Sequence, residues 1–254
     1  MKEVKFKLKS TNGYNISAKS YLPQESPKEI IIAVHGFAGD KESSAISLLA
    51  KEMTKEGFGV VCFDFPGHGE SEVEADKLTI DNCINDIETI EEYIKEKYGK
   101  QMKIDLFATS FGAYITLLKI FKYNTKYNKI ELSAPAIKMD KIFKETLLRE
   151  TFEEFQKRGI TKLGFDRIMN IPFSFYEELK QNQILKIYKN SQKILIIQGT
   201  EDDVAPIKDT KELIDLDKTN FELFEIRGAD HRMKKDGELE KAINKAKEYF
   251  LIKF

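Results

Sequence analysis

The chain has 254 residues, of which 41% are hydrophobic and 33% are charged, and its formal net charge is −1. This length and hydrophobic content predict one large domain with a substantial core. The lysines are spread along the chain, so the sequence gives no sign of the basic surface that nucleic-acid binding requires, and we expect no nucleic-acid partner.

The N-terminal residues 1–10 alternate between charged and apolar side chains and lack the apolar core of a signal peptide. No apolar run is long enough to cross a membrane. We therefore expect a cytoplasmic protein without a membrane span. Cys62 lies in an apolar strand and Cys83 in a predicted helix, which favours two buried free thiols. Their spacing and the low number of histidines argue against a zinc site.

The first half of the chain alternates strand and helix patterns. Residues 3–9 and 14–22 alternate in polarity around the Asn12-Gly13 turn signal, which predicts a β-hairpin. Continuous apolar runs indicate strands that are buried on both faces, and apolar residues at helical spacing indicate the intervening helices. The strands are expected at 30–34, 60–63 and 104–108, and the helices at 43–56, 80–98 and beyond Gly112.

The pattern breaks between a short strand at 129–133 and its resumption at 193–197. Residues 137–190 show no clear strand. Residues 139–157 are predicted to be helical, and Ser174 with Glu177 forms a capping-box pattern for a second helix. We interpret 137–190 as a small, mainly helical cap inserted into a single domain spanning 1–254. Beyond it come a helix at 207–216, a strand at 221–226 and a closing helix at 237–250.

Alternating strands and helices specify a doubly wound α/β fold with a mostly parallel sheet, preceded here by the N-terminal hairpin. Ligands bind to such sheets at the carboxyl ends of the strands. The unusual glycine- and histidine-containing loops all follow strands, so we expect them to collect at one sheet edge.

Ser110 lies between the strand at 104–108 and the following helix. From this local pattern alone, a helix-capping serine and an exposed nucleophile are equally good interpretations. A nucleophilic serine needs a histidine base and an orienting carboxylate. His35 and His68 lie in tight glycine-containing turns, where bonding to the backbone is the better interpretation. His231 follows the last strand and remains as the candidate base.

Three acidic residues compete for the orienting role after the strand at 193–197, namely Glu201, Asp202 and Asp203, and Asp140 is a weaker alternative. Attack on a carbonyl also requires donors for the oxyanion. The backbone N–H groups of Phe37 and Phe111 are the candidates for this oxyanion hole.

Five segments together resemble the α/β-hydrolase superfamily in order and spacing. The fourth position of the family pattern G-x-x-D-x-x-V-P corresponds to Asp202, so the resemblance implies Ser110, Asp202 and His231 as the catalytic residues. Ala205 stands at the valine position of this pattern, and Ala108 stands at the first glycine position of the family's G-x-S-x-G pattern. The segments are His-Gly-Phe-Ala-Gly (35–39), Asp-Phe-Pro-Gly-His-Gly-Glu-Ser (64–71), Ala-Thr-Ser-Phe-Gly (108–112), Gly-Thr-Glu-Asp-Asp-Val-Ala-Pro (199–206) and Gly-Ala-Asp-His (228–231).

Within the superfamily the chain resembles the compact branch of feruloyl and cinnamoyl esterases, monoacylglycerol lipases and serine aminopeptidase-like hydrolases. The resemblance implies that the cap lines the substrate pocket. Its candidate substrate-binding residues are Phe143, Phe173 and Tyr176.

The leading hypothesis is a serine carboxylic-ester hydrolase that acts through an acyl-enzyme on aromatic or short-chain acyl esters. It needs no metal or organic cofactor, its partner is a small-molecule ester, and its activity should fall at acid pH as His231 is protonated. Three alternatives remain open: a monoacylglycerol lipase- or lysophospholipase-like enzyme, an aminopeptidase-like enzyme, and a catalytically silent ligand-binding scaffold. The oligomeric state is also open, with a homodimer among the alternatives.

Overall fold

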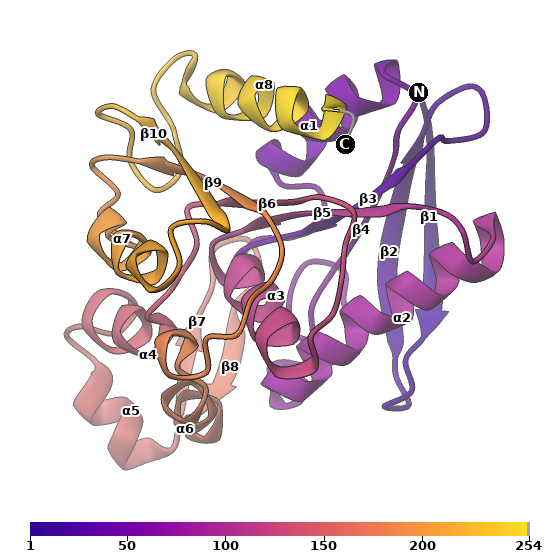
Figure 1. Cartoon of the computed structure of the whole chain (residues 1–254). Coiled ribbons are helices and arrows are strands. Elements are labelled where there is room, and N and C mark those ends of the chain that lie inside the picture. The colour runs from indigo at the N-terminus through magenta and orange to yellow at the C-terminus, as the bar shows by residue number, and fades with distance from the viewer. Residues whose placement is uncertain (253–254) are drawn as a thin grey trace.

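The computed structural model describes residues 1–252 and contains an eight-stranded sheet (Figure 1). The strand order is β1-β2-β4-β3-β5-β6-β9-β10. The first three strands in this order pair antiparallel, and all later neighbours pair parallel. The strands are β1 (Lys2–Lys9), β2 (Asn15–Leu22), β3 (Ile30–Val34), β4 (Gly59–Phe63), β5 (Ile104–Thr109), β6 (Ile130–Ser133), β9 (Ile194–Gly199) and β10 (Phe221–Ile226).

The central strands are buried on both faces, as their continuous apolar sequences predict. In β3, Ile30, Ile32 and Val34 belong to the core on one side of the sheet, whereas Ile31 and Ala33 belong to the core on the other. Side chains alternate across a strand, so both faces of the sheet require a covering layer of helices.

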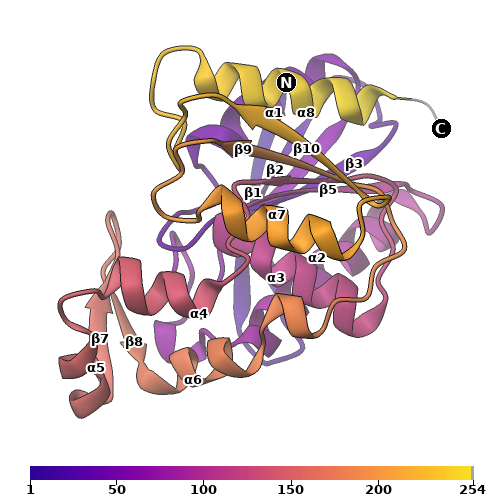
Figure 2. The same ribbon diagram turned by 60° about the vertical axis from the view of Figure 1, so that its left-hand side comes forward.

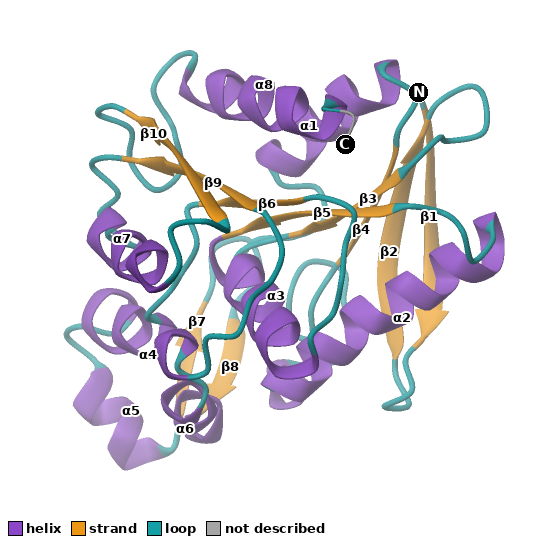
Figure 3. Ribbon diagram, viewed as in Figure 1, coloured by secondary structure: helices purple, strands orange, loops and turns teal. Residues whose placement is uncertain are grey.

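Two helices cover one face of the sheet and three cover the other (Figures 2 and 3). One buried apolar stripe joins each of the helices except α3 to the sheet, whereas α3 is buried on all sides from Phe111 to Phe121. The doubly wound α/β fold and the N-terminal hairpin are thereby confirmed. The first face carries α1 (Ser44–Lys55) and α8 (Glu238–Leu251), and the second carries α2 (Ile80–Tyr98), α3 (Ser110–Tyr123) and α7 (Ile207–Leu216), with the short 3-10 helix η1 (Ala75–Lys77) before α2.

The segment between β6 and β9 packs beside α2 and α3 rather than extending the sheet (Figure 1). Its Glu178 carboxylate accepts a hydrogen bond of 2.8 Å from the Ile80 N–H at the start of α2, which fastens the segment to the main fold. The segment comprises α4 (Met139–Lys141), a π-helical turn η2 (Ile142–Leu147), α5 (Phe152–Arg158), β7 (Ile160–Leu163), β8 (Met169–Pro172), α6 (Phe173–Gln181) and a 3-10 turn η3 (Ile184–Lys186).

The prediction that 137–190 contains no clear strand was wrong, because β7 and β8 form an antiparallel hairpin there. Each strand has only four residues, and the side chains of β7 are exposed or half-buried. In β8 the buried Met169 and Ile171 alternate with Asn170, but an alternating pattern over only four residues is too short to identify a strand.

Two helix predictions in this segment also need correction. The expected helix at 139–157 is interrupted, since the Leu148 N–H bonds to the Phe143 carbonyl in a wide turn and a new helix starts at Phe152. The capping box at Ser174 does not form. Strand β8 runs through Pro172 directly into α6, which leaves Ser174 inside the helix without a capping hydrogen bond.

Both cysteines are buried and unpaired, as the sequence predicts. Within residues 1–252, none of the helices combines the length and the hydropathy needed to span a lipid bilayer.

Candidate active site

Ser110 lies at the sharp turn where β5 ends and α3 begins. Its φ angle is +49°, a left-handed conformation that non-glycine residues rarely adopt outside functional sites. The turn requires a close approach of α3 to β3. A Cβ atom at Gly112 would lie 2.5 Å from the His35 carbonyl oxygen and 2.7 Å from that of Val34. Glycine at 112 therefore allows the helix to start directly against the strand, with Ser110 at the tip of the turn.

Three side chains from separate loops form a continuous hydrogen-bonded chain. The Ser110 Oγ lies 3.0 Å from His231 Nε2, and His231 Nδ1 lies 2.9 Å and 3.0 Å from the two oxygens of Asp202. The carboxylate is fully buried and the imidazole side chain is 13% exposed. With the proton on Nδ1 bonded to Asp202, the Nε2 lone pair faces the serine hydroxyl. This is the arrangement in which a histidine can accept a serine proton.

The Asp202 carboxylate is held by further donors from its own loop. One oxygen accepts hydrogen bonds from the backbone N–H groups of Val204 (3.0 Å) and Ala205 (2.7 Å), and the other accepts one from the Gln198 amide (3.2 Å). The Gln198 carbonyl oxygen in turn accepts a bond from the Thr210 hydroxyl. These contacts fix the carboxylate plane relative to the imidazole.

The competing acids lie elsewhere. Glu201 and Asp203 are exposed, and Asp140 bonds to the Gln183 amide at 3.1 Å. Among the acids considered from the sequence, the structure brings only Asp202 to His231.

The loops that carry Asp202 and His231 lie against each other at the ends of β9 and β10. The Glu201 N–H donates to the Ala229 carbonyl at 3.0 Å. A Cβ atom at Gly199 would lie 2.2 Å from the same carbonyl oxygen, so the approach depends on glycine. Parallel pairing of β9 with β10 thus brings residues 29 positions apart into contact.

His35 and His68 bond to the backbone, as expected from the sequence. His35 Nε2 accepts from the Phe65 N–H at 3.1 Å, so its Nδ1 carries the proton and donates to the Gly36 carbonyl at 2.8 Å. His68 Nδ1 bonds to the Pro66 carbonyl at 2.9 Å. Burial lowers the pKa of both side chains, that of His68 to about 3, so both are neutral at pH 7.

The two candidate oxyanion donors flank Ser110. The Phe111 N–H belongs to the first turn of α3, whose amide groups are not used within the helix. The Gly36–Phe37 peptide lies beside the serine, since a Cβ atom at Gly36 would lie 3.2 Å from the Ser110 Cβ. The Gly36 carbonyl accepts bonds from His35 and from the Gly39 N–H (3.1 Å). A trans peptide is planar, so fixing this carbonyl also fixes the opposite direction of the Phe37 N–H.

The three aromatic residues predicted to contact the substrate occupy two different environments. The Phe143 ring packs edge-on against the Phe37 ring, with centroids 5.7 Å apart. Phe173 and Tyr176 instead pack with the phenylalanines of α5, within the inserted segment. Phe175, which sequence reasoning had not selected, packs against both Phe37 and Phe111. Its ring centroid lies 6.3 Å from that of Phe37 and 6.0 Å from that of Phe111. Helical spacing alone did not indicate which aromatic faces the sheet edge.

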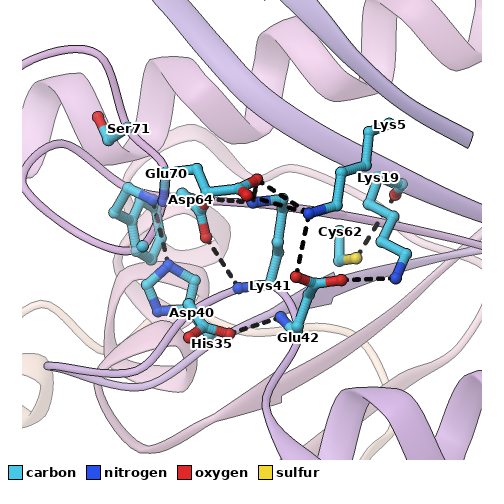
Figure 4. Close-up of polar contacts among 12 residues, drawn as sticks. Lys5, Lys19, His35, Asp40, Lys41, Glu42, Cys62, Asp64, Glu70 and Ser71 are labelled. Atoms are coloured by element: carbon cyan, nitrogen blue, oxygen red, sulfur yellow. Dashed lines mark hydrogen bonds and ion pairs between the residues drawn. The ribbon is translucent and has the colours of Figure 1, made fainter. Parts of the chain in front are cut away.

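Sequence reasoning also missed a buried ion pair beside residues 35–41, the loop that carries the candidate oxyanion donor Phe37. Lys41 and Asp64 contact each other in the interior between the loops that follow β3 and β4 (Figure 4). Both residues stand in or beside recognised motifs, but neither spacing nor periodicity predicts that their side chains meet.

Comparisons with known proteins agree with this architecture. The family model described as serine aminopeptidase, S33, matches residues 25–183, more than half of the chain. The structure resembles Est1E from Butyrivibrio proteoclasticus with ferulic acid bound, with a TM-score of 0.82 and 19% identity over 97% of this chain and 98% of that one. It also resembles a putative hydrolase from Agrobacterium vitis S4, with a TM-score of 0.79 and 18% identity over 98% of each chain.

A curated relative is similar over a shorter stretch. Protein phosphatase methylesterase 1 of Candida albicans is 31% identical over 107 residues, which cover 42% of this chain and 28% of the relative. The aligned stretch thus spans little more than a quarter of the relative's length. Taken with the family match and the shared fold, the sequence and the structure agree on one assignment: the chain belongs to the serine aminopeptidase (S33) family of the α/β-hydrolase superfamily.

Proposed function

We propose that this protein is a serine hydrolase that cleaves carboxylic esters through an acyl-enzyme intermediate. Ser110 is the nucleophile, His231 is the general base and acid, and Asp202 orients His231. The observation that carries the proposal is the unbroken chain from the Ser110 Oγ through His231 to the buried Asp202, with bonds of 2.9–3.0 Å.

The chemistry follows from the protonation states. His231 Nε2 accepts the Ser110 proton as Oγ attacks the ester carbonyl, and the imidazolium that forms is stabilised by Asp202. The N–H groups of Phe37 and Phe111 stabilise the oxyanion. As the C–O bond breaks, His231 returns the proton to the alcohol. Water, deprotonated by the same nitrogen, then attacks the acyl-enzyme and releases the acid and free Ser110.

We propose that residues 137–190 act as a cap over this site and help to select the acyl group. Phe143 and Phe175 extend from the inserted segment to Phe37, and Phe175 also contacts Phe111. Phe143 and Phe175 are fully buried, so they form an aromatic wall behind the half-buried Phe37 on the oxyanion side of the site. Such a wall favours an apolar or aromatic acyl group over a charged one. The ferulic acid bound to Est1E suggests hydroxycinnamoyl esters for the first substrate panel, beside short-chain acyl esters.

Amide hydrolysis is the second candidate, because the matching family is described as serine aminopeptidase. An aminopeptidase needs acids that bind the free amine of its substrate. The acids of the inserted segment at Glu150, Glu153 and Glu154 are all exposed, and Glu154 pairs with Arg158 at 2.8 Å. This observation favours the ester over the amide. Parallel assays of p-nitrophenyl esters and aminoacyl p-nitroanilides test the choice, and faster turnover of the anilides would reverse it.

Replacement of Ser110 by alanine tests the central assignment. Loss of a nucleophilic serine lowers kcat by on the order of 10⁶-fold in enzymes with this kind of triad, so Ser110→Ala should abolish turnover of p-nitrophenyl butyrate and labelling by a fluorophosphonate. Ser174→Ala is the matched control, because Ser174 also lies in the first turn of a helix but is exposed and caps nothing. A Ser110→Ala protein that retains most activity would refute the proposal.

A further inference from the structure

A lysine and an aspartate form a fully buried ion pair beside the candidate oxyanion loop, residues 35–41. The side chains of Lys41 and Asp64 are 1% and 0% exposed. The Lys41 ammonium donates to one Asp64 oxygen at 2.5 Å, and the Lys41 backbone N–H donates to the other at 2.8 Å. The carboxylate therefore holds both the side chain and the main chain of the last residue of this loop.

Asp64 also holds the neighbouring loop, which follows β4. Its Oδ2 accepts from the Glu70 N–H at 2.9 Å, and the Glu70 carboxylate accepts from the Lys41 ammonium at 2.7 Å (Figure 4). The chain at 69 lies so close that a Cβ atom on Gly69 would be 2.4 Å from an Asp64 oxygen. One buried pair thus joins the loops that follow β3 and β4.

Charges in the protein interior are costly to bury, and removing one partner leaves the other uncompensated. Well-packed apolar side chains of similar volume often stabilise a fold as well as a buried ion pair does, or better. What the pair supplies in addition is directional hydrogen bonding that fixes geometry. A role in positioning the adjoining backbone therefore accounts for it better than a role in stability.

The backbone positioned by the pair is the oxyanion loop itself. At its start, His35 bonds to the Phe65 N–H and to the Gly36 carbonyl. At its end, Lys41 bonds to Asp64. Between these anchors the chain turns through Ala38, whose φ of +57° is strained for a non-glycine residue. Anchors at both ends, on adjacent residues 64 and 65, hold that turn in place.

We infer that the buried Lys41–Asp64 pair is a positioning device for the oxyanion hole, which keeps the Phe37 N–H directed at the carbonyl oxygen of the substrate. The inference rests on the proposed function. Both side chains are buried, so they would act through the backbone of residues 36–39.

Lys41→Met removes the ammonium and keeps the length of the side chain. Loss of an oxyanion donor costs about 10²–10³ in kcat, and a displacement of about 1 Å at a reacting group costs about 10²-fold. We therefore expect kcat to fall by about 10²-fold, per active site titrated with a fluorophosphonate, with KM within about threefold of wild type because the donor acts mainly in the transition state. Lys41→Arg, which keeps the charge, should retain more of kcat than Lys41→Met.

The matched control is Lys129→Met. Lys129 is also a buried lysine, with its ammonium bonded at 2.6 Å to the Phe250 carbonyl. It lies at the amino-terminal end of the inner strand β6, whereas the candidate site lies at the carboxyl ends of the strands. It should lower stability without lowering kcat per titrated site. If Lys41→Met yields no titratable protein, the near-isosteric Asp64→Asn is measured in the same way. It should likewise lower kcat while leaving KM close to that of wild type.

Inhibition by a trifluoromethyl ketone separates positioning from general damage, because its hemiketal oxyanion occupies the oxyanion hole. The affinity of the variants for this inhibitor should fall in parallel with kcat/KM, whereas inhibition by the product acid should not change. Wild-type kcat in Lys41→Met, or a loss of kcat without loss of inhibitor affinity, would overturn the inference while Ser110→Ala remains inactive. An active Ser110→Ala protein would instead overturn the proposed function, and this inference with it.

Discussion

Replacing Asp202 by asparagine should inactivate the proposed enzyme through the tautomer of His231. One oxygen of Asp202 accepts two backbone N–H bonds, from Val204 and Ala205, so the amide oxygen of asparagine will take that position. The NH₂ group then occupies the other position, 2.9 Å from His231 Nδ1. The NH₂ group cannot accept from Nδ1–H, so an imidazole protonated at Nδ1 keeps only the 3.0 Å bond to the amide oxygen, which two backbone N–H groups already share. The tautomer protonated at Nε2 instead accepts from the NH₂ group at Nδ1 and is therefore favoured.

An imidazole protonated at Nε2 cannot accept the Ser110 proton, although Ser110 and His231 stay 3.0 Å apart. In serine hydrolases this change lowers kcat by about 10⁴-fold, which corresponds to about 5 kcal/mol of transition-state free energy. The assay is the steady-state hydrolysis of p-nitrophenyl butyrate at pH 7.5, with fluorophosphonate labelling of Ser110 measured in parallel.

The control is Asp203→Asn, which makes the same substitution at the next residue, where the side chain is exposed. A surface change of this kind should alter kcat by no more than about twofold. If Asp202→Asn lost less than about tenfold in kcat, or no more than Asp203→Asn, Asp202 would not orient the base.

Two further predictions concern stability. Gly112→Ala places a methyl group 2.5 Å from the His35 carbonyl oxygen, so it should lower the free energy of unfolding by about 1–3 kcal/mol or more and slow fluorophosphonate labelling; a urea midpoint equal to that of wild type would contradict it. Glu131 is fully buried, and burial raises its pKa from 4.5 to about 8. Between these values the folded protein keeps a proton that the unfolded chain has lost, so stability falls as pH rises, by up to about 1.4 kcal/mol per pH unit. Glu131→Gln removes this contribution. Urea unfolding at pH 5–8 should show the free energy of unfolding of the variant rising relative to that of wild type as the pH rises. Parallel plots of this free energy against pH would disprove the prediction.

Much of the main fold was predictable from the sequence, because its strands and helices carry strong local patterns. The continuous apolar run at 30–34 can be satisfied only by burial on both faces, and the Asn12-Gly13 turn between alternating segments specifies a hairpin. The hairpin β7–β8 escaped prediction because its strands have four residues each, which is too short for a reliable pattern, although β8 alternates and buries Met169 and Ile171. Its pairing depends on the packing of the inserted segment.

For the candidate site, the order of residue types along the chain indicated Ser110 and His231, and family resemblance singled out Asp202 among three neighbouring acids. By itself the sequence determined the strand–helix alternation and, through it, the sheet edge at which these loops meet. Only the tertiary structure decided that Asp202, rather than Glu201 or Asp203, contacts the imidazole, that Phe175 reaches Phe37, and that Lys41 and Asp64 pair in the interior. The physical reason is that periodicity records which residues are buried, whereas a hydrogen bond or an ion pair depends on distances of about 3 Å between atoms far apart in sequence.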